Sequence, residues 1–167
     1  MTWRLRSAGP GDLATIMAIE NASFAGDAWQ ESTMRSELAS TSTRYLVAET
    51  VDEPHEVVAY SGLLAPVGAD DADVQTIAVT QAAQRNGIGR ALMQRMMTEA
   101  RDRGAAQMFL EVRADNPTAK ALYDSLGFEV LAVREHYYQP DDVAAIVMRA
   151  SLAAPASALA TDGQEQA

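Results

Sequence analysis

The sequence predicts an α+β, or mixed α/β, fold built on one sheet. Three observations support this prediction. Strand-like segments are mixed with four helical patterns, and strand pairs near both ends are joined by short polar turns. Between them, residues 74–103 read as a buried strand, a glycine-containing turn and a long helix. A chain of 167 residues is long enough to form one such domain with a substantial core.

The N-terminal part predicts one strand and two helices. Residues 3–6 alternate apolar and charged side chains, as a strand with one buried face does. The run 10–12, Pro-Gly-Asp, opens a helix in which Leu13, Ile16, Met17 and Glu20 recur at helical spacing. Residues 24–29 interrupt this pattern, and a second short helix carries Met34 and Leu38.

Three strands are predicted next. Residues 44–50 and 57–65 are strand-like and are joined by the polar turn 52–56. Residues 74–80 are mostly apolar and β-branched, which indicates a buried strand. The helix after this strand has an apolar stripe and ends at Gly104. The stripe consists of Ile88, Leu92, Met96 and Ala100, broadened by Met93 and Met97.

The C-terminal part predicts a strand, a capped helix and two further strands. Residues 108–113 alternate, with Glu111 on the face opposite Leu110 and Val112. Asn116 is a favourable N-cap for the helix that Gly127 ends, and Pro117 suits its first position. Residues 128–134 and 144–148 form the last strands. The domain is predicted over 1–150, with a disordered, alanine-rich tail over 151–167.

The composition excludes several classes of protein. The chain has no cysteine, so it cannot form a disulfide or an acyl-cysteine intermediate, and its two histidines do not have metal-ligand spacing. A net charge of -10 argues against direct nucleic-acid binding. An acidic surface would suit a cationic substrate, and the alternative is that the negative charge only keeps the protein soluble. Without a membrane-spanning run or a signal-peptide pattern, we expect a cytoplasmic monomer or weak dimer, with no metal.

The turn between the central strand and helix has the features of an anion site. Gly87 and Gly89 let the backbone approach a ligand, and the first N–H groups of a helix have no internal partner. Together with the helix dipole they favour a phosphate, and Arg85 and Arg90 add positive charge. The alternative is a tight turn without a ligand. A Walker A loop and a dinucleotide fingerprint both fit poorly, because Arg90 and Leu92 replace their required residues.

This turn closely resembles the acyl-coenzyme A loop of the GNAT acetyltransferases, with Gln84, Gly87 and Gly89 at the family's positions. The resemblance extends over residues 3–149. It implies a mixed, mostly antiparallel sheet of about seven strands, with helices on both faces and a splay beside the central strand. It also implies that acetyl-CoA binds to the turn and to the preceding strand. The implied contacts are Ile77, Ala78, Val79, Gln84, Arg85, Asn86, Gly87, Ile88, Gly89 and Arg90.

Acetyl transfer to an amine needs a base for the ammonium and a proton donor for the departing thiolate. Glu111 is the best carboxylate, because it lies in an otherwise apolar strand and burial would make it a stronger base. The alternative is a glutamate on a solvated face or one paired with Arg113. Tyr123 lies on the apolar stripe of its helix and could donate to sulfur, although a tyrosine in this position is more often part of the core.

The runs Leu110–Asn116 and Ala121–Phe128 resemble the RimI-type branch, the ribosomal-protein alanine N-acetyltransferases. The resemblance implies Glu111 as general base, Tyr123 as general acid toward coenzyme A, and Asn116 as a cofactor contact. Tyr137 and Tyr138 resemble the segment that binds the first residues of a peptide. The predicted partner is therefore the N-terminus of a ribosomal protein or another peptide, with alanine preferred and direct attack in a ternary complex.

One departure from this branch lies in the link between the first two helices. Phe24 and Trp29 are separated by four residues without the usual proline, and Gln30 replaces a serine. These aromatic residues would line the acceptor site or pack into the core. A GNAT enzyme for a small amine, an antibiotic or a lysine side chain is the nearest alternative. A coenzyme A- or nucleotide-binding module without catalysis and a nicotinamide-dependent oxidoreductase are the others.

Overall fold

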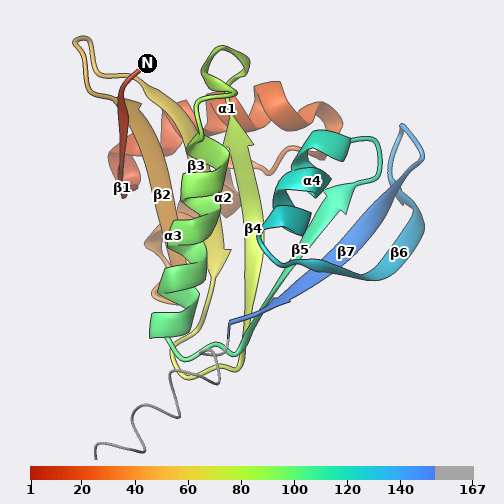
Figure 1. Cartoon of the computed structure of the whole chain (residues 1–167). Helices are drawn as coiled ribbons and strands as arrows, with labels where there is room; N and C mark the ends of the chain where they lie inside the picture. Colours follow the sequence, from red (N-terminus) through yellow and green to blue (C-terminus); the bar gives the residue numbers. More distant parts are fainter. Residues whose placement is uncertain (153–167) are drawn as a thin grey trace, which may run out of the picture.

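The computed structural model describes residues 1–152, which form one seven-stranded sheet with four α-helices (Figure 1). The strands are β1 Trp3–Ser7, β2 Thr43–Thr50, β3 Val57–Leu64, β4 Asp71–Val79, β5 Gln107–Arg113, β6 Glu129–Tyr138 and β7 Val143–Ser151. The helices are α1 Leu13–Phe24, α2 Glu31–Ala39, α3 Ile88–Asp102 and α4 Pro117–Ser125. The predicted mixed α/β fold is confirmed.

The strands follow the order β1-β2-β3-β4-β5-β7-β6. Every neighbouring pair is antiparallel except β4 and β5, which are parallel. The parallel pair requires a crossover, and α3 provides it between these two strands. The sheet is therefore mixed and mostly antiparallel, as the family resemblance implied.

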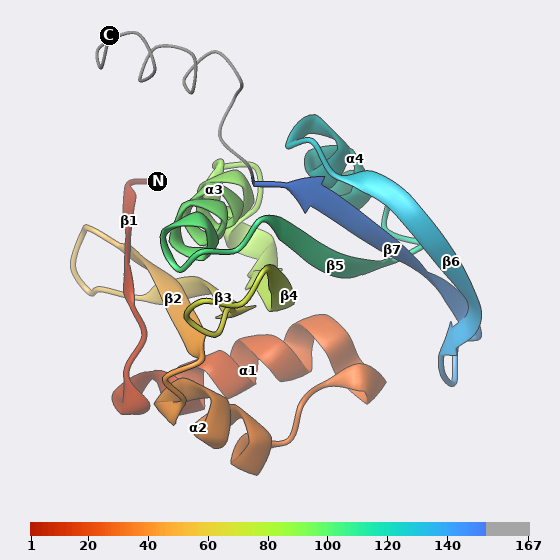
Figure 2. The same ribbon diagram turned by 90° about the horizontal axis from the view of Figure 1, so that it is seen from below.

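The helices cover both faces of the sheet (Figure 2). On one face, α3 buries the predicted stripe, in which Ile88, Leu92, Met96 and Ala100 are each at most 1% exposed. The capped helix α4 packs on the same face through Tyr123. On the opposite face, α1 and α2 bury Ile16 and Met34 against the strands. Each helical stripe thus meets an apolar strand face, which is why β2 and β3 are buried on both sides, whereas β6 is exposed along nearly its whole length.

The central strands separate shortly after they begin. The pairing of β4 with β5 is confined to Asp71–Asp73 against Gln107–Phe109. Both strands continue, to Val79 and Arg113 respectively, without further pairing between them. The predicted splay is confirmed, and Figure 1 shows the two strands diverging. Their facing edges therefore keep backbone groups that are not used by the sheet.

A β-bulge shapes β4 at the mouth of this splay. Gly62 of β3 pairs with Thr76, whereas Leu63 pairs with Val74, so Gln75 is the extra residue. The phenol of Tyr45 donates to the Gln75 side chain at 2.7 Å and holds it on the α2 side of the sheet. The bulge changes which face each following side chain takes, and bulges commonly occur beside active sites.

The strand boundaries differ from prediction by more than one residue at three places. Strand β4 begins at Asp71 rather than Val74, because its polar first residues pair with β5. Strand β6 continues to Tyr138, four residues past the predicted end. At the C-terminus, Ser151 belongs to β7, and Leu152 is 1% exposed and donates its N–H to Ala106. The domain therefore extends two residues further, and the rest of the predicted tail, 153–167, lies outside the described residues.

None of the helices within residues 1–152 has the length and apolar character needed to cross a membrane.

Candidate active site

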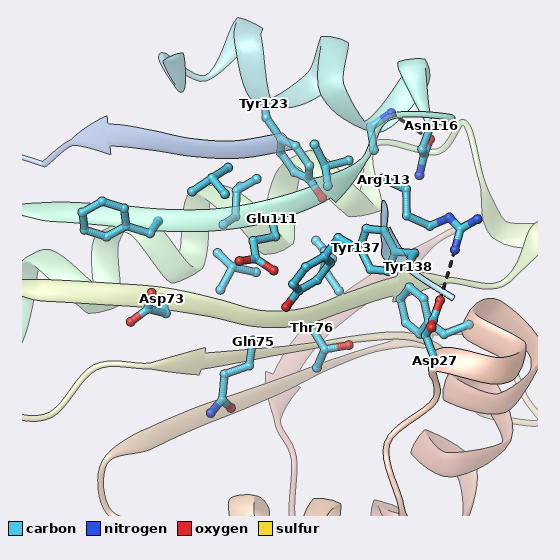
Figure 3. Close-up of a pocket in the computed structure, with 18 of the residues that line it drawn as sticks. Asp27, Asp73, Gln75, Thr76, Glu111, Arg113, Asn116, Tyr123, Tyr137 and Tyr138 are labelled. Atoms are coloured by element: carbon cyan, nitrogen blue, oxygen red, sulfur yellow. Dashed lines mark hydrogen bonds and ion pairs between the residues drawn. The ribbon is translucent and has the colours of Figure 1, made fainter. Parts of the chain in front are cut away.

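A cleft of about 900 Å³ occupies the splay between β4 and β5. It is lined by residues from five segments of the chain that are far apart in sequence, including both predicted catalytic residues. All four residues predicted to bind the acceptor line it as well. The predicted residues that meet here are Phe24, Trp29, Ile77, Glu111, Asn116, Tyr123, Tyr137 and Tyr138. Figure 3 shows the Glu111 and Tyr123 side chains extending from β5 and α4 into this space.

Glu111 reaches the cleft, but the premise that it is buried is wrong. A third of its side chain, 33%, is exposed, because β5 loses its β4 neighbour before this residue. Its carboxylate lies 3.4 Å from the guanidinium of Arg134 on β6. The alternative that paired it with Arg113 is also wrong, since Arg113 binds three aspartates instead. Glu111 is therefore an accessible carboxylate with one exposed cationic partner.

Asp73 lies at the closed end of the cleft, at the last paired residue of β4. Burial raises the pKa of Asp73 above its ordinary value, and the negative charges of Asp71 and Glu111 raise it further. Asp73 is therefore harder to ionise than an exposed aspartate.

Tyr123 is 7% exposed and packs edge-on against Phe128, with ring centroids 6.1 Å apart. Burial raises the pKa of Tyr123 to about 12, so its phenol is neutral at physiological pH. Tyr123 thus belongs to the core and also lines the cleft, and its role as a proton donor stays a prediction.

Asn116 is the N-cap of α4, as predicted, and its Oδ1 accepts the N–H of Ala119 at 3.2 Å. It also lines the cleft. Because the Oδ1 of Asn116 is engaged in the cap, its NH2 group is the part of the side chain that could contact a ligand.

The predicted anion loop lies at the start of α3, outside the lining of the cleft. Gly87 is the N-cap and has φ of +78°, a conformation that favours glycine. The Gln84 amide donates to the Val79 carbonyl at 3.3 Å, and that of Asn86 donates to Ala83 at 2.9 Å. The indole of Trp3 donates to the Asn86 carbonyl at 3.1 Å. These side chains hold the loop in shape, so any ligand contact here falls to the backbone.

The backbone N–H groups of residues 85–90 form an unbroken series of six free donors. Within the part of the chain that the structure describes, none of them has a hydrogen-bond acceptor, and the first N–H bonded at this end of α3 is that of Ala91. Arg90 donates to the Ser125 hydroxyl at 2.9 Å, which places its charge beside α4. Six donors at a helix N-terminus, flanked by arginines, form a strong anion-binding arrangement.

The three predicted residues of β4 differ in direction. Ile77 and Val79 pack on the α3 face, and Ile77 lines the cleft. Ala78 is 6% exposed and points to the α1 face, so it can meet a ligand only through its backbone.

The side of the cleft that is predicted to bind the acceptor is aromatic. Phe24 is the last residue of α1 and Trp29 lies in the link to α2, and both also pack on the core beneath these helices. Tyr137 and Tyr138 come from the end of β6, with ring centroids 5.1 Å apart in an edge-on arrangement. Phe24 and Trp29 therefore pack on the core and also line the cleft, and their contact with an acceptor stays a prediction.

Sequence reasoning missed one buried polar cluster at the cleft. Glu20 of α1 is 1% exposed and lines the cleft. One of its carboxylate oxygens accepts from the hydroxyls of Tyr60 and Thr76. Burial raises the pKa of Tyr60, and the Glu20 carboxylate raises it further. The local pattern indicated only a helical position for Glu20, on the same face as Ile16, and this alignment with the buried stripe was the one signal of its burial.

Comparisons with known proteins identify the class of this chain. The model of the Acetyltransferase (GNAT) family matches residues 13–128. The [ribosomal protein bS18]-alanine N-acetyltransferase of Escherichia coli is 38% identical over 114 residues, covering 68% of this chain and 73% of that protein. The crystal structure of the E. coli ribosomal-protein-S18-alanine N-acetyltransferase gives a TM-score of 0.79 at 31% identity, covering 92% of this chain and 96% of that one.

Two mycobacterial proteins extend the comparison. The N-alpha-acetyltransferase RimI of Mycobacterium tuberculosis is 34% identical over 141 residues, covering 83% of this chain and 85% of that protein. The uncharacterized protein ML0378 of Mycobacterium leprae is 36% identical over 143 residues, which are 84% of this chain and 38% of that protein. The chain thus spans little more than a third of ML0378. It belongs to the GNAT family of N-acetyltransferases, and its similarity to RimI-type members agrees with the sequence motifs.

Proposed function

We propose that the protein transfers the acetyl group of acetyl-CoA to the α-amine at the N-terminus of a protein. Alanine is the preferred first residue, and a ribosomal protein is the expected substrate. The observation that carries this proposal is the position of the splay. It opens a gap between β4 and β5 that Glu111 and Tyr123 line, and the loop with the free N–H groups of residues 85–90 follows the unpaired end of β4 in the chain.

The cofactor half of the site fits acetyl-CoA on chemical grounds. Its pyrophosphate is an anion that six free backbone donors at a helix N-terminus can hold. Its pantetheine arm carries amide groups, which can pair with the unpaired edges of β4 and β5 as an added strand does. An N–H of β4, such as that of Val79, would then polarise the thioester carbonyl.

Glu111 is assigned the role of base. An α-ammonium has a pKa of about 8 and must lose a proton before it can attack. The exposed Glu111 carboxylate can take this proton through a water molecule and release it to solvent. The neutral amine then attacks the thioester carbon directly, because the chain has no cysteine to carry the acetyl group.

Tyr123 is assigned the role of proton relay to sulfur. As the carbon–sulfur bond breaks, the hydroxyl donates its proton to the leaving sulfur and receives one from the attacking nitrogen. A relay suits this residue, because a phenol with a pKa of about 12 is too weak an acid to protonate by itself a thiolate whose conjugate acid has a pKa of about 8.5. The products are an N-acetylated peptide and free coenzyme A.

The acceptor half supports a peptide over a small molecule. The aromatic wall is built from two separate segments, with Phe24 and Trp29 at the end of α1 and after it, and Tyr137 and Tyr138 at the end of β6. The E. coli relative at 38% identity is a [ribosomal protein bS18]-alanine N-acetyltransferase. This similarity supports alanine at the first position and a ribosomal substrate.

A peptide panel tests the proposal. Peptides that begin with alanine, serine, leucine or lysine are compared with an α-N-blocked lysine peptide and with small amines, with acetyl-CoA as donor and release of free thiol as readout. Mass spectrometry then locates the acetyl group. We expect the highest kcat/KM for the alanine peptide, with the acetyl group on its α-amine. Turnover of a small amine or of the lysine side chain alone would refute it.

A further inference from the structure

Arg113 joins three separate segments at the acceptor end of the cleft. Its Nη1 lies 3.0 Å from Asp27 in the 3-10 turn Ala25–Asp27 between α1 and α2. Its Nη2 lies 3.1 Å from Asp141 in the turn between β6 and β7. Its Nε lies 3.0 Å from Asp115, just beyond the end of β5. We call these four residues the Arg113 clasp, and Figure 3 shows its ion pair with Asp27.

The clasp depends on the shape of the guanidinium group. A guanidinium presents its donors in a rigid fork, so it can bind three carboxylates at once, whereas an ammonium is a single point charge. Arg113 is largely enclosed, with 24% of its side chain exposed, and its guanidinium carbon lies 5.1 Å from the ring centroid of Tyr138. Hydrogen bonds from Arg113 lower the pKa of Asp115 below its ordinary value, which keeps that carboxylate charged.

The clasp stands between two cavities. A second cavity of about 260 Å³ lies behind the acceptor end of the main cleft. It is lined by residues 23–27, at the end of α1 and in the turn that follows it, by residues 139–141 of the β6–β7 turn, and by Arg113. Phe24, Asp27 and Arg113 line both cavities. The ion-paired side chains are therefore the wall that divides the space open to an acceptor.

We propose that Arg113 is a specificity-determining residue that limits the size of the acceptor's first side chain. Arg113 lies two residues after Glu111 in β5. Held in place by Asp27 and Asp141, its side chain separates the main cleft from the second cavity. A small first residue then fits beside the base, while a larger one meets the guanidinium. This inference rests on the proposed function, because it assigns a subsite to the N-terminal residue of a peptide.

The chain offers a matched set of variants. Arg113→Ala removes the wall, and Asp27→Ala and Asp141→Ala each remove one tie between segments. Asp115→Ala removes an ion pair of similar length. Because Asp115 is only two residues from Arg113, this ion pair does not tie Arg113 to another segment, and the variant is the control. The readout is the ratio of kcat/KM for two peptides that differ only in beginning with alanine or with leucine. Loss of stability alone lowers both values and leaves the ratio unchanged.

We expect Arg113→Ala to lower the alanine-to-leucine ratio at least about tenfold, which is the discrimination that side-chain size gives in an apolar pocket. Asp27→Ala and Asp141→Ala should move it in the same direction by less. Arg113→Lys should be intermediate, because an ammonium reaches one carboxylate at a time. The ratio for Asp115→Ala should equal that of the wild type.

Two results would overturn the inference, and they are distinguishable. If the wild type acetylates the alanine peptide and the ratio stays constant in all variants, the clasp does not set specificity. If the wild type acetylates neither peptide, the proposed function fails and this subsite fails with it. Should Arg113→Ala not fold, as judged by its thermal melting curve, the Asp27→Ala/Asp141→Ala double variant replaces it in the same comparison, because both of these carboxylates are partly exposed.

Discussion

Glu111 works in a charged environment that the strand pattern does not reveal. Its carboxylate is 3.4 Å from Arg134, whose guanidinium also lies over the Tyr137 ring at 5.6 Å from the centroid. The proposed base and one wall of the proposed acceptor site are therefore linked by a single arginine. Since this arginine side chain is 56% exposed, its ion pair with Glu111 can open when an ammonium group arrives.

Replacing Glu111 by glutamine should affect chemistry and not cofactor binding. The amide keeps the shape of the side chain but cannot accept the amine's proton, so we expect turnover to fall by roughly 100-fold or more. The Kd for acetyl-CoA, measured by calorimetry, should be unchanged. Glu129→Gln, at an exposed carboxylate of β6 outside the cleft lining, is the control. Unchanged turnover in Glu111→Gln would remove this residue from the role of base.

His136 gives the turn after β6 a dependence on pH. Its Nδ1 lies 2.6 Å from Asp142, and this interaction raises the pKa of His136 above its ordinary value of 6.5. A raised pKa in the folded state means that the pair stabilises the turn fully below pH 6.5, down to the pH at which Asp142 takes up a proton, and His136 lowers the pKa of Asp142 below its ordinary value. This stabilisation is lost as the pH rises through the higher folded value.

The test is the titration of the His136 ring followed by NMR. We expect its midpoint above 6.5 in the wild type and a lower midpoint in Asp142→Asn, which removes the charge. Denaturation at several pH values should show the stability difference between the two proteins at acidic pH and its decline toward alkaline pH. Equal midpoints in the two proteins would show that the pair does not form in solution.

Among the elements, the start of α3 is the part to which we assign cofactor binding. Gly87→Ala should weaken acetyl-CoA binding, because alanine at φ of +78° costs about 1–2 kcal/mol and moves the six N–H groups away from this arrangement. Gly104→Ala is the matched control, since Gly104 has φ of +102° at the other end of the same helix. Both variants should melt at lower temperature. If both retain wild-type affinity for acetyl-CoA, the loop is a structural turn only.

The bulge in β4 depends on a close contact between two strands. A Cβ atom on Gly62 would overlap the ring of Tyr45, which is 4% exposed and anchors Gln75. Gly62→Ala must displace this ring, so we expect it to lower the free energy of unfolding by about 1–3 kcal/mol. Gly11→Ala has no atom near its Cβ and should change stability little. Equal stability of the two variants in chemical denaturation would contradict this packing.

Over the molecule as a whole, the parts read correctly from the sequence are those fixed by local patterns. The stripe of α3, the Asn116 cap and the alternation that sets Glu111 opposite Leu110 all depend on residues within a few positions of one another. These patterns, with the family motifs, were enough to predict the fold and eight of the residues that line the cleft.

The remaining features depend on pairing between distant segments. Strand register determines the point at which β4 and β5 separate, and it also makes Gln75 the bulged residue. No local sequence pattern specifies this register. For the same reason the partner of Glu111 is Arg134 and not the neighbouring Arg113, which is taken by Asp27 and Asp141. Glu20, 40 residues from Tyr60 in the chain, is another case.

The proposed function requires that the splay guide an acetyl thioester into the space between Glu111 and Tyr123. A crystal structure of the protein with acetyl-CoA is the decisive experiment. We predict the pyrophosphate on the N–H groups of residues 85–90, the pantetheine arm between β4 and β5, and the sulfur beside the Tyr123 hydroxyl. A pyrophosphate bound elsewhere, or a thioester outside the splay, would contradict the proposed mechanism.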